Sequence, residues 1–166
     1  YTTARSPLAY NDAARDLVLG FKHGDKTYAV QTFLPWLERA GADMLAEADA
    51  LIPVPLHYWR MVKRRYSQAG IIAQALAHSA DVPVMKDVLT RGRHTPSQGH
   101  LSRNLRSENV EGAFAVPPHK ASKIAGKTLI LIDDVYTTGA TMHEAVKILR
   151  RAGAKNIIGF VVAKAE

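Results

Sequence analysis

Short, continuous apolar segments alternate with longer amphipathic segments along this chain. The apolar segments have the length and turn boundaries of strands buried on both faces. Such strands are predicted at 50–54, 128–134 and 157–163, with shorter extended segments at 82–89 and 113–116. Apolar residues at helical spacing predict helices at 11–24, 27–40, 67–80 and 138–152. The alternation predicts an α/β fold with an open, mostly parallel sheet flanked by helices.

Single residues refine these boundaries. Ser67 is expected to cap the helix that follows it, and Gly153 is expected to close the last helix. Pro35 is expected to bend or divide the second helix, because its ring removes a hydrogen bond and crowds the preceding turn. The segment 92–102 has no apolar periodicity and contains Gly and Pro, so a mobile loop is predicted there.

Two adjacent carboxylates, Asp133 and Asp134, follow the strand Leu129–Ile132. In an open α/β sheet, ligands bind at the edge where the strands end, so both acids are expected at that edge. A short loop follows, and then a helix whose N-terminus favours an anion. The loop provides hydroxyls, backbone amides and a flexible glycine through Thr137, Thr138, Gly139, Ala140 and Thr141. A phosphate on the loop and hydroxyls on the acids would together describe a ribose 5-phosphate.

Composition narrows the remaining possibilities. The chain has 166 residues and no Cys, which excludes disulfides and thiolate metal sites within it. It has no apolar run of the roughly 18 residues that a membrane helix needs, so no membrane insertion and a cytoplasmic location are expected. The motifs of P-loop ATPases and of dinucleotide-binding enzymes are absent. One domain is predicted over 1–166, with 1–45 as a helical lead-in or hood and 46–166 as the core.

The net charge of +7 is concentrated in the middle of the chain. Residues 57–106 hold nine basic and two acidic side chains, whereas the flanking segments nearly balance. Two basic loops on either side of one helix could converge on a polyanion. The alternative is a solvated basic face that binds nothing.

The segment Leu129–Thr141 resembles the signature of phosphoribosyltransferases, which bind phosphoribosyl pyrophosphate (PRPP). Tyr136 departs from that signature, since an aliphatic residue is usual at its position. More of the chain resembles the ComF-like competence proteins of this family, through Phe21–Asp25, Ile52–His57 and Arg64–Gln68. Family members usually begin with a four-Cys zinc-binding module, which this chain lacks.

The resemblance implies a type I phosphoribosyltransferase fold and a set of site residues. Asp133 and Asp134 would act as the catalytic acids and would help to hold Mg²⁺, mainly through substrate and water. Residues 137–141 would bind the 5′-phosphate. Pyrophosphate would be bound by Leu56, His57, Arg60, Arg64 and Arg65. A mobile loop would close over the site with Arg91, Thr95, Gln98, Arg103 and Arg106.

The acceptor of the phosphoribosyl group stays open, as does catalysis itself. The rival interpretation is a non-catalytic module that binds single-stranded DNA through basic loops and exposed aromatic side chains. The ComF-like resemblance implies partners of that kind, single-stranded DNA and competence proteins, and a role in DNA uptake. A third interpretation, a Mg²⁺-dependent phosphohydrolase, has less support because no third acidic ligand or nucleophile pattern accompanies the acid pair.

Overall fold

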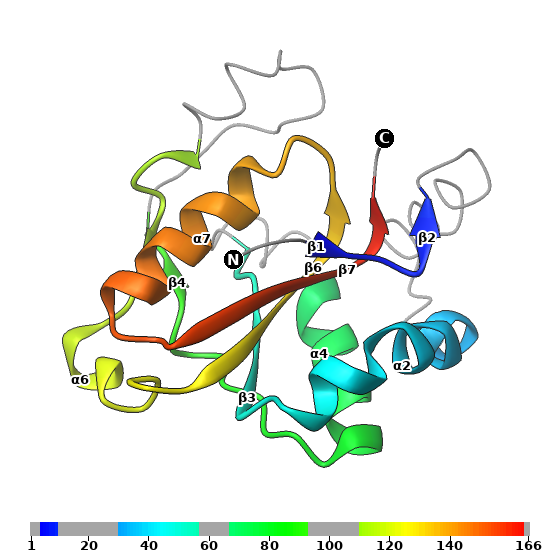
Figure 1. Cartoon of the computed structure of the whole chain (residues 1–166). Helices are drawn as coiled ribbons and strands as arrows, with labels where there is room; N and C mark the ends of the chain where they lie inside the picture. Colours follow the sequence, from blue (N-terminus) through cyan, green and yellow to red (C-terminus); the bar gives the residue numbers. More distant parts are fainter. Residues whose placement is uncertain (1–3, 10–29, 57–66, 93–109, 165–166) are drawn as a thin grey trace.

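The computed structural model describes residues 4–9, 30–56, 67–92 and 110–164. Its centre is a parallel sheet in the order β1-β7-β6-β3, with β2 also paired to β7 (Figure 1). The strands are β1 (Ala4–Arg5), β2 (Leu8–Ala9), β3 (Ala50–Pro53), β6 (Thr128–Tyr136) and β7 (Asn156–Lys164). Every pairing in this sheet is parallel, which confirms the predicted fold class.

The beginning of the chain forms one edge of this sheet. Both β1 and β2 pair with β7, and the chain between them contains Ser6 and Pro7. Pro7 has no N–H to donate to the ladder, and the Ser6 hydroxyl donates instead to the carbonyl of Val162 at 2.9 Å. Two-residue strands carry no periodic signal, so the sequence did not predict this edge.

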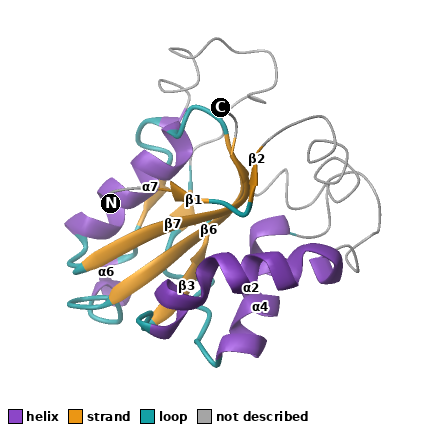
Figure 2. Cartoon of the chain, turned by 45° about the vertical axis from the view of Figure 1, so that its right-hand side comes forward, coloured by secondary structure: helices purple, strands orange, loops and turns teal. Residues whose placement is uncertain are grey.

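Helices cover both faces of the sheet (Figure 2). On one face, called the α2/α4 face, α2 (Val30–Ala46) and α4 (Gln68–Ala80) pack together on β6 and β7. On the other, called the α7 face, α7 (Ala140–Arg151) packs on the same strands. The core side chains of the α2/α4 face include Phe33, Leu37, Ile72, Leu76 and Ile130; those of the α7 face include Leu129, Leu131, Met142 and Leu149.

Helix α2 differs from its prediction in two respects. Pro35 lies inside it without dividing it, and the helix continues to Ala46 instead of ending at Ala40. Pro35 is exposed, so its ring faces solvent and the buried side of the helix continues past it. Residues Phe33 and Leu37 are fully buried against the sheet. The described part of 1–45 therefore packs into the same core as the sheet, and the predicted lead-in or hood stays a prediction.

A small antiparallel sheet flanks α7. It pairs β4 (Thr90–Arg91) with β5 (Phe114–Ala115) and is followed by the short helix α6 (Pro118–Ala121). Pro118 begins α6, where its missing N–H costs no helical hydrogen bond. Within the predicted extended segment 82–89, only Val84 is paired, in a single bridge to Leu51.

Two predicted segments lie wholly or mostly outside the described residues. They are the helix at 11–24 and the loop at 92–102, of which only Gly92 is described. In the described part of the chain, none of the helices combines the length and the apolar character needed to cross a membrane.

Candidate functional site

The two acids lie where strand β6 changes its alternation. Leu131 and Tyr136 pack on the α7 face, whereas Ile132 and Val135 pack on the α2/α4 face. Strict alternation would send side chains three residues apart to opposite faces, yet Ile132 and Val135 share one. The pattern therefore shifts by one residue at Asp133–Asp134.

Each carboxylate is held by the backbone that follows it. An oxygen of Asp133 accepts a hydrogen bond from the Asp134 amide at 2.9 Å, and an oxygen of Asp134 accepts one from the Val135 amide at 2.7 Å. Both side chains are half-buried. The acids do not end the strand, as the sequence had indicated, because β6 continues to Tyr136, which is paired with Lys164 of β7. The acid pair is thus fixed in orientation and still open to solvent.

The segment Thr137–Thr141, called here the phosphate loop, connects β6 to α7. Gly139 has a φ of +78°, a left-handed conformation that favours glycine, and no side-chain hydrogen bond caps the helix that it begins. The nearest approach is a long one, 3.4 Å from the Ala140 amide to the Thr138 hydroxyl. The first helical hydrogen bond runs from the His143 amide to the Gly139 carbonyl at 2.8 Å. The first amides of α7 therefore lack an acceptor within the helix and favour an anion.

Tyr136 and Lys164 lie beside this loop, and neither is among the predicted site residues. A Cβ atom on Gly139 would lie 2.3 Å from the Tyr136 hydroxyl oxygen, so the tip of the phenol ring touches the glycine. The Lys164 ammonium lies 5.7 Å from the centre of the same ring. The position of Lys164 directly after the strand at 157–163, beside the site strand in a parallel sheet, is a signal that could have found it.

The predicted pyrophosphate-binding turn is described only at its start. Leu56 follows β3, and the Val54 amide donates to the Ile132 carbonyl at 2.8 Å, so this strand ends beside the acid pair. Leu56 is half-buried at that edge. The other predicted members, His57, Arg60, Arg64 and Arg65, lie outside the described residues.

Of the residues assigned to the mobile loop, Arg91 is the one described, and it does not lie in a loop. It forms part of β4, is half-buried, and places its guanidinium 5.2 Å from the centre of the Phe114 ring. Next to β5, the Gly112 amide donates to Glu144 on α7 at 3.0 Å. The small sheet is thus attached to the first turns of the site helix. Thr95, Gln98, Arg103 and Arg106 lie outside the described residues.

The donor set suits Mg²⁺ only if other oxygens complete its shell. Within the described ranges, no cluster of three or more His, Cys, Asp or Glu side chains could hold a metal ion. Asp133 and Asp134 provide carboxylate oxygens, which Mg²⁺ prefers, and this ion usually keeps several waters and binds substrate phosphates. The residues present therefore fit a Mg²⁺ ion bound mainly through substrate and water.

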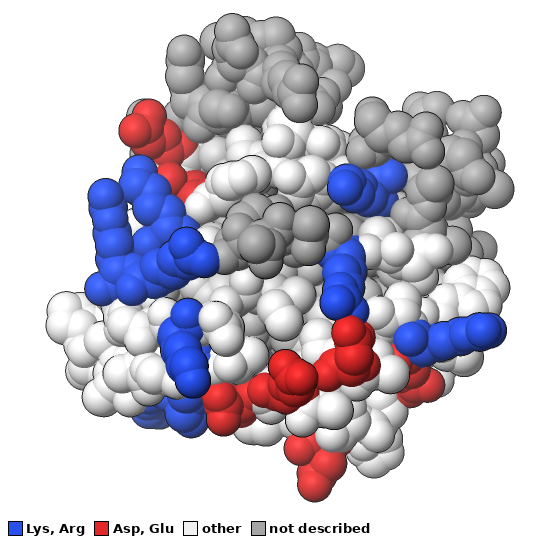
Figure 3. Space-filling view, in the orientation of Figure 1, with Lys and Arg blue, Asp and Glu red and all other residues white. Residues whose placement is uncertain are grey.

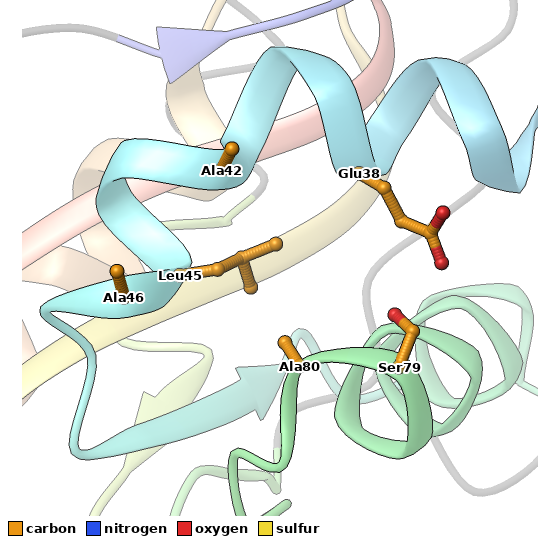
Figure 4. A pocket seen from close by; sticks show the side chains of 6 residues that line it. All are labelled: Glu38, Ala42, Leu45, Ala46, Ser79 and Ala80. Carbon is orange, nitrogen blue, oxygen red and sulfur yellow. The ribbon is translucent and has the colours of Figure 1, made fainter.

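A shallow groove of about 410 Å³ lies between α2 and α4 (Figure 4). Glu38 on α2 and Ser79 on α4 extend toward each other across it, above the small side chains of the two helices. Because α4 starts at the carboxyl edge of the sheet and ends near Val84, which pairs with Leu51, this groove lies at the opposite edge from the acids. It does not belong to the acid–phosphate-loop site.

Basic side chains gather over the C-terminal part of α7, where the helix ends with Arg150 and Arg151 (Figure 3). This end of the helix is the one farther from the phosphate loop. Seven of the nine basic residues in the segment 57–106 lie outside the described residues, so their predicted convergence stays a prediction.

Known proteins resemble this chain in sequence and fold. The family described as "Phosphoribosyl transferase domain" matches residues 66–165. Competence protein F of Haemophilus influenzae is 33% identical over 141 residues, covering 85% of this chain and 61% of the relative. DNA utilization protein YhgH of Salmonella typhi is 34% identical over 109 residues, covering 66% of this chain and 46% of the relative. The chain thus spans about half to three fifths of these two relatives.

The fold has solved counterparts. Orotate phosphoribosyltransferase from Aeropyrum pernix superimposes with a TM-score of 0.52 and 21% identity, covering 93% of this chain and 66% of that one. This likeness concerns the fold. Together with the family match over residues 66–165 and the similarity to Competence protein F, it leads to one conclusion. The chain belongs to the phosphoribosyl transferase domain family and is a ComF-like protein with the phosphoribosyltransferase fold.

Proposed function

We propose that this chain binds PRPP, or a closely related ribose phosphate, at the carboxyl edge of its sheet. The observation that carries the proposal is the uncapped start of α7 directly after the half-buried acid pair. A helix N-terminus without its own acceptor attracts a phosphate, and carboxylates accept hydrogen bonds from vicinal hydroxyls. A ribose 5-phosphate carries both groups at a separation that one strand–loop–helix unit can span.

In this proposal, the phosphate loop holds the 5′-phosphate and Asp133 and Asp134 hold the ribose hydroxyls. The local hydrogen bonds from the Asp134 and Val135 amides orient the carboxylates before the sugar arrives. A carboxylate has about four lone-pair sites, so it can accept a backbone amide and a hydroxyl together. Their negative charge would also stabilise positive charge that develops on the ribose ring when the bond to pyrophosphate breaks.

The pyrophosphate end is assigned to the turn after β3 and to cations around it. Leu56 would offer its backbone, and His57, Arg60, Arg64 and Arg65 would add donors and positive charge. Arg91, Thr95, Gln98, Arg103 and Arg106 would approach from the small sheet and the segment that follows it. Bound Mg²⁺ would neutralise charge on the pyrophosphate oxygens. Turnover and the acceptor remain outside the proposal.

The biological role that we propose is a part in DNA uptake. Its support is the printed names of relatives, which describe one as a competence protein and another as a DNA utilization protein. The second candidate function, a module that binds single-stranded DNA without catalysis, is favoured by the same names and by the basic segment 57–106.

Calorimetric titration of PRPP with and without Mg²⁺ tests the sugar-phosphate site. The comparison is between the native chain and the Asp133→Asn/Asp134→Asn double variant, with Asp81→Asn as control. Asp81 ends α4 in a left-handed conformation that Asn tolerates, so its replacement removes one carboxylate without touching the site. We expect Mg²⁺-dependent binding that falls by at least about a hundredfold, or about 3 kcal/mol, in the double variant only.

A titration with single-stranded DNA on the same proteins separates the two functions. Salt-sensitive DNA binding by both the native chain and the double variant, without binding of PRPP to either, would reject the sugar-phosphate site. It would leave the DNA-binding module as the function of this domain.

A further inference from the structure

Tyr136 closes one side of the phosphate loop. The space that a Cβ of Gly139 would occupy is filled by the tip of its ring, with the hydroxyl oxygen at 2.3 Å and Cζ at 2.6 Å from that point. The ring is half-buried and packs on the α7 face of the core, so its position is supported from behind. A ligand on the loop must therefore approach Gly139 from the other side.

Lys164 places a positive charge beyond this ring. It is paired with Tyr136 in the register of β6 and β7, and parallel partners present their side chains on the same face. Its ammonium lies 5.7 Å from the ring centre, a cation–π distance, while the side chain stays exposed. The ring holds the lysine near the loop without neutralising it. Among the described residues, no carboxylate forms an ion pair with this lysine.

The Tyr136 ring and the Lys164 charge both distinguish a terminal phosphate from a phosphodiester, the ring by shape and the lysine by electrostatics. A terminal phosphate has one ester substituent and needs one exit from the loop, whereas a phosphodiester has two substituents and needs two. A terminal phosphate also carries close to two negative charges at neutral pH, since its second pKa is about 6, and a diester carries one. The α7 N-terminus and Lys164 both stabilise the ion of higher charge.

We propose that Tyr136 and Lys164 restrict the phosphate loop to terminal phosphate monoesters and exclude the internal phosphodiesters of a nucleic acid strand. This inference rests on the proposed function, because it takes the loop to be the phosphate site. It assigns Tyr136 and Lys164 as specificity determinants of that site. A DNA strand could then reach the loop only through a phosphorylated end.

The test compares two small probes, ribose 5-phosphate and its methyl phosphodiester, by titration followed in NMR spectra. The native chain is expected to bind the monoester at least about tenfold more tightly than the diester. Tyr136→Val, which introduces the aliphatic type usual in related signatures, is expected to reduce this ratio to about two by admitting the diester. Tyr136→Phe keeps the ring and is expected to keep the ratio. If the Val variant fails to fold, the comparison of the two probes on the native chain and on Lys164→Gln carries the test.

Lys164→Gln is expected to weaken binding of the monoester about fivefold and binding of the diester by about half that factor. Lys155→Gln, an exposed lysine at the other edge of the sheet, is the matched control and should change neither. Equal affinity of the native chain for both probes would overturn the inference while leaving the proposed site intact. A ratio that persists in Tyr136→Val would overturn the role of the ring. Failure of the native chain to bind either probe would reject the proposed function itself.

Discussion

Helices α4 and α7 begin at the same edge of the same sheet, each after a strand of the parallel core, but their first turns differ. Helix α4 is capped by a side chain of this chain, because the Ser67 hydroxyl accepts a hydrogen bond from the Gly70 amide at 3.1 Å. Helix α7 begins at Gly139, which has no side chain to serve as a cap. The start of α4 is capped by a side chain, whereas in the described residues the only side-chain acceptor for the first amides of α7 is the Thr138 hydroxyl, at 3.4 Å from the Ala140 amide.

The difference indicates where this fold leaves room for a ligand. A side-chain cap contributes about 1 kcal/mol to helix stability, so a helix that gives it up needs an external acceptor to satisfy its first amides. The acids at 133–134 precede the open start, and no comparable acid pair precedes the closed one. Removing a hydroxyl at the start of α4 should therefore lower stability more than binding. Removing one at the start of α7 should lower binding more than stability.

Gly139→Ala should have the largest effect. The substitution forces a side chain into a left-handed backbone and places its Cβ 2.3 Å from the Tyr136 oxygen. We expect the free energy of unfolding in urea to fall by about 2–4 kcal/mol, since strain and overpacking act together. Binding of ribose 5-phosphate should be lost because the amides of the loop would move.

Gly126→Ala is the matched control for this variant. Its φ of +73° is similar, but nothing lies within 4 Å of the added Cβ. Only the backbone strain of about 1–2 kcal/mol should remain. Equal destabilisation by the two variants would contradict the contact between Tyr136 and Gly139. A Gly139→Ala/Tyr136→Val double variant should recover part of the loss, since the two residues share that contact.

Ser67→Ala and Thr138→Ala should separate the two starts. Ser67→Ala removes a cap and should lower the free energy of unfolding by about 1 kcal/mol, with unchanged ribose 5-phosphate affinity. Thr138 has only a 3.4 Å approach to the Ala140 amide, so its replacement should cost less than about 0.5 kcal/mol. It should nevertheless weaken ribose 5-phosphate severalfold by removing a donor. If both variants changed stability and ribose 5-phosphate affinity to the same extent, the two helix starts would not differ in the way described.

These two starts also show what a sequence can predict. Ser67 before an apolar helical pattern predicted its cap, and the continuous apolar strands predicted the parallel sheet, because both signals are local. The break in alternation at Asp133–Asp134 was not predictable, since a strand that is apolar on both faces does not indicate which face each residue takes. The change from an aliphatic residue to Tyr136 was visible, but its contact with Gly139 depends on the path of the loop.

Gln68→Met should have a smaller effect. It tests whether the buried polar groups at the start of α4 are all satisfied by hydrogen bonds. Gln68 is 2% exposed, and its side-chain nitrogen has no hydrogen-bond partner among the residues that the structure describes. Replacing a buried amide whose nitrogen is unpartnered should raise the free energy of unfolding by up to about 1 kcal/mol. Gln74→Met, at an exposed position of the same helix, should change little. A loss above about 1 kcal/mol in Gln68→Met alone would show that this amide has a partner, and that the start of α4 is also built around an acceptor.

The smallest expected effect comes from an ion pair that makes the stability of the fold depend on pH. It matters for the choice of pH at which the two helix starts are compared. The proposed binding of ribose 5-phosphate uses the carboxylates at 133–134, so a loss of binding in acid must be distinguished from loss of the fold. Arg5 on β1 donates to both carboxylate oxygens of Asp43 on α2 at 2.6 Å and holds the pKa of Asp43 below its ordinary value of 3.8. A lowered pKa in the folded state means that the pair stabilises the fold above the ordinary pKa.

That contribution is lost as the pH falls below about 4 and through the lowered pKa of Asp43. Asp43→Asn should therefore lower the urea midpoint slightly at pH 7 and should match the native chain in strong acid. The effect should be small, because both side chains are exposed and water screens the pair. Glu47→Gln controls for removing an exposed carboxylate directly after the same helix. A constant difference between Asp43→Asn and the native chain at every pH would show that the ion pair does not set this response. If ribose 5-phosphate binding is lost at a pH where both proteins remain folded, the acid dependence belongs to the open start of α7 and not to the fold.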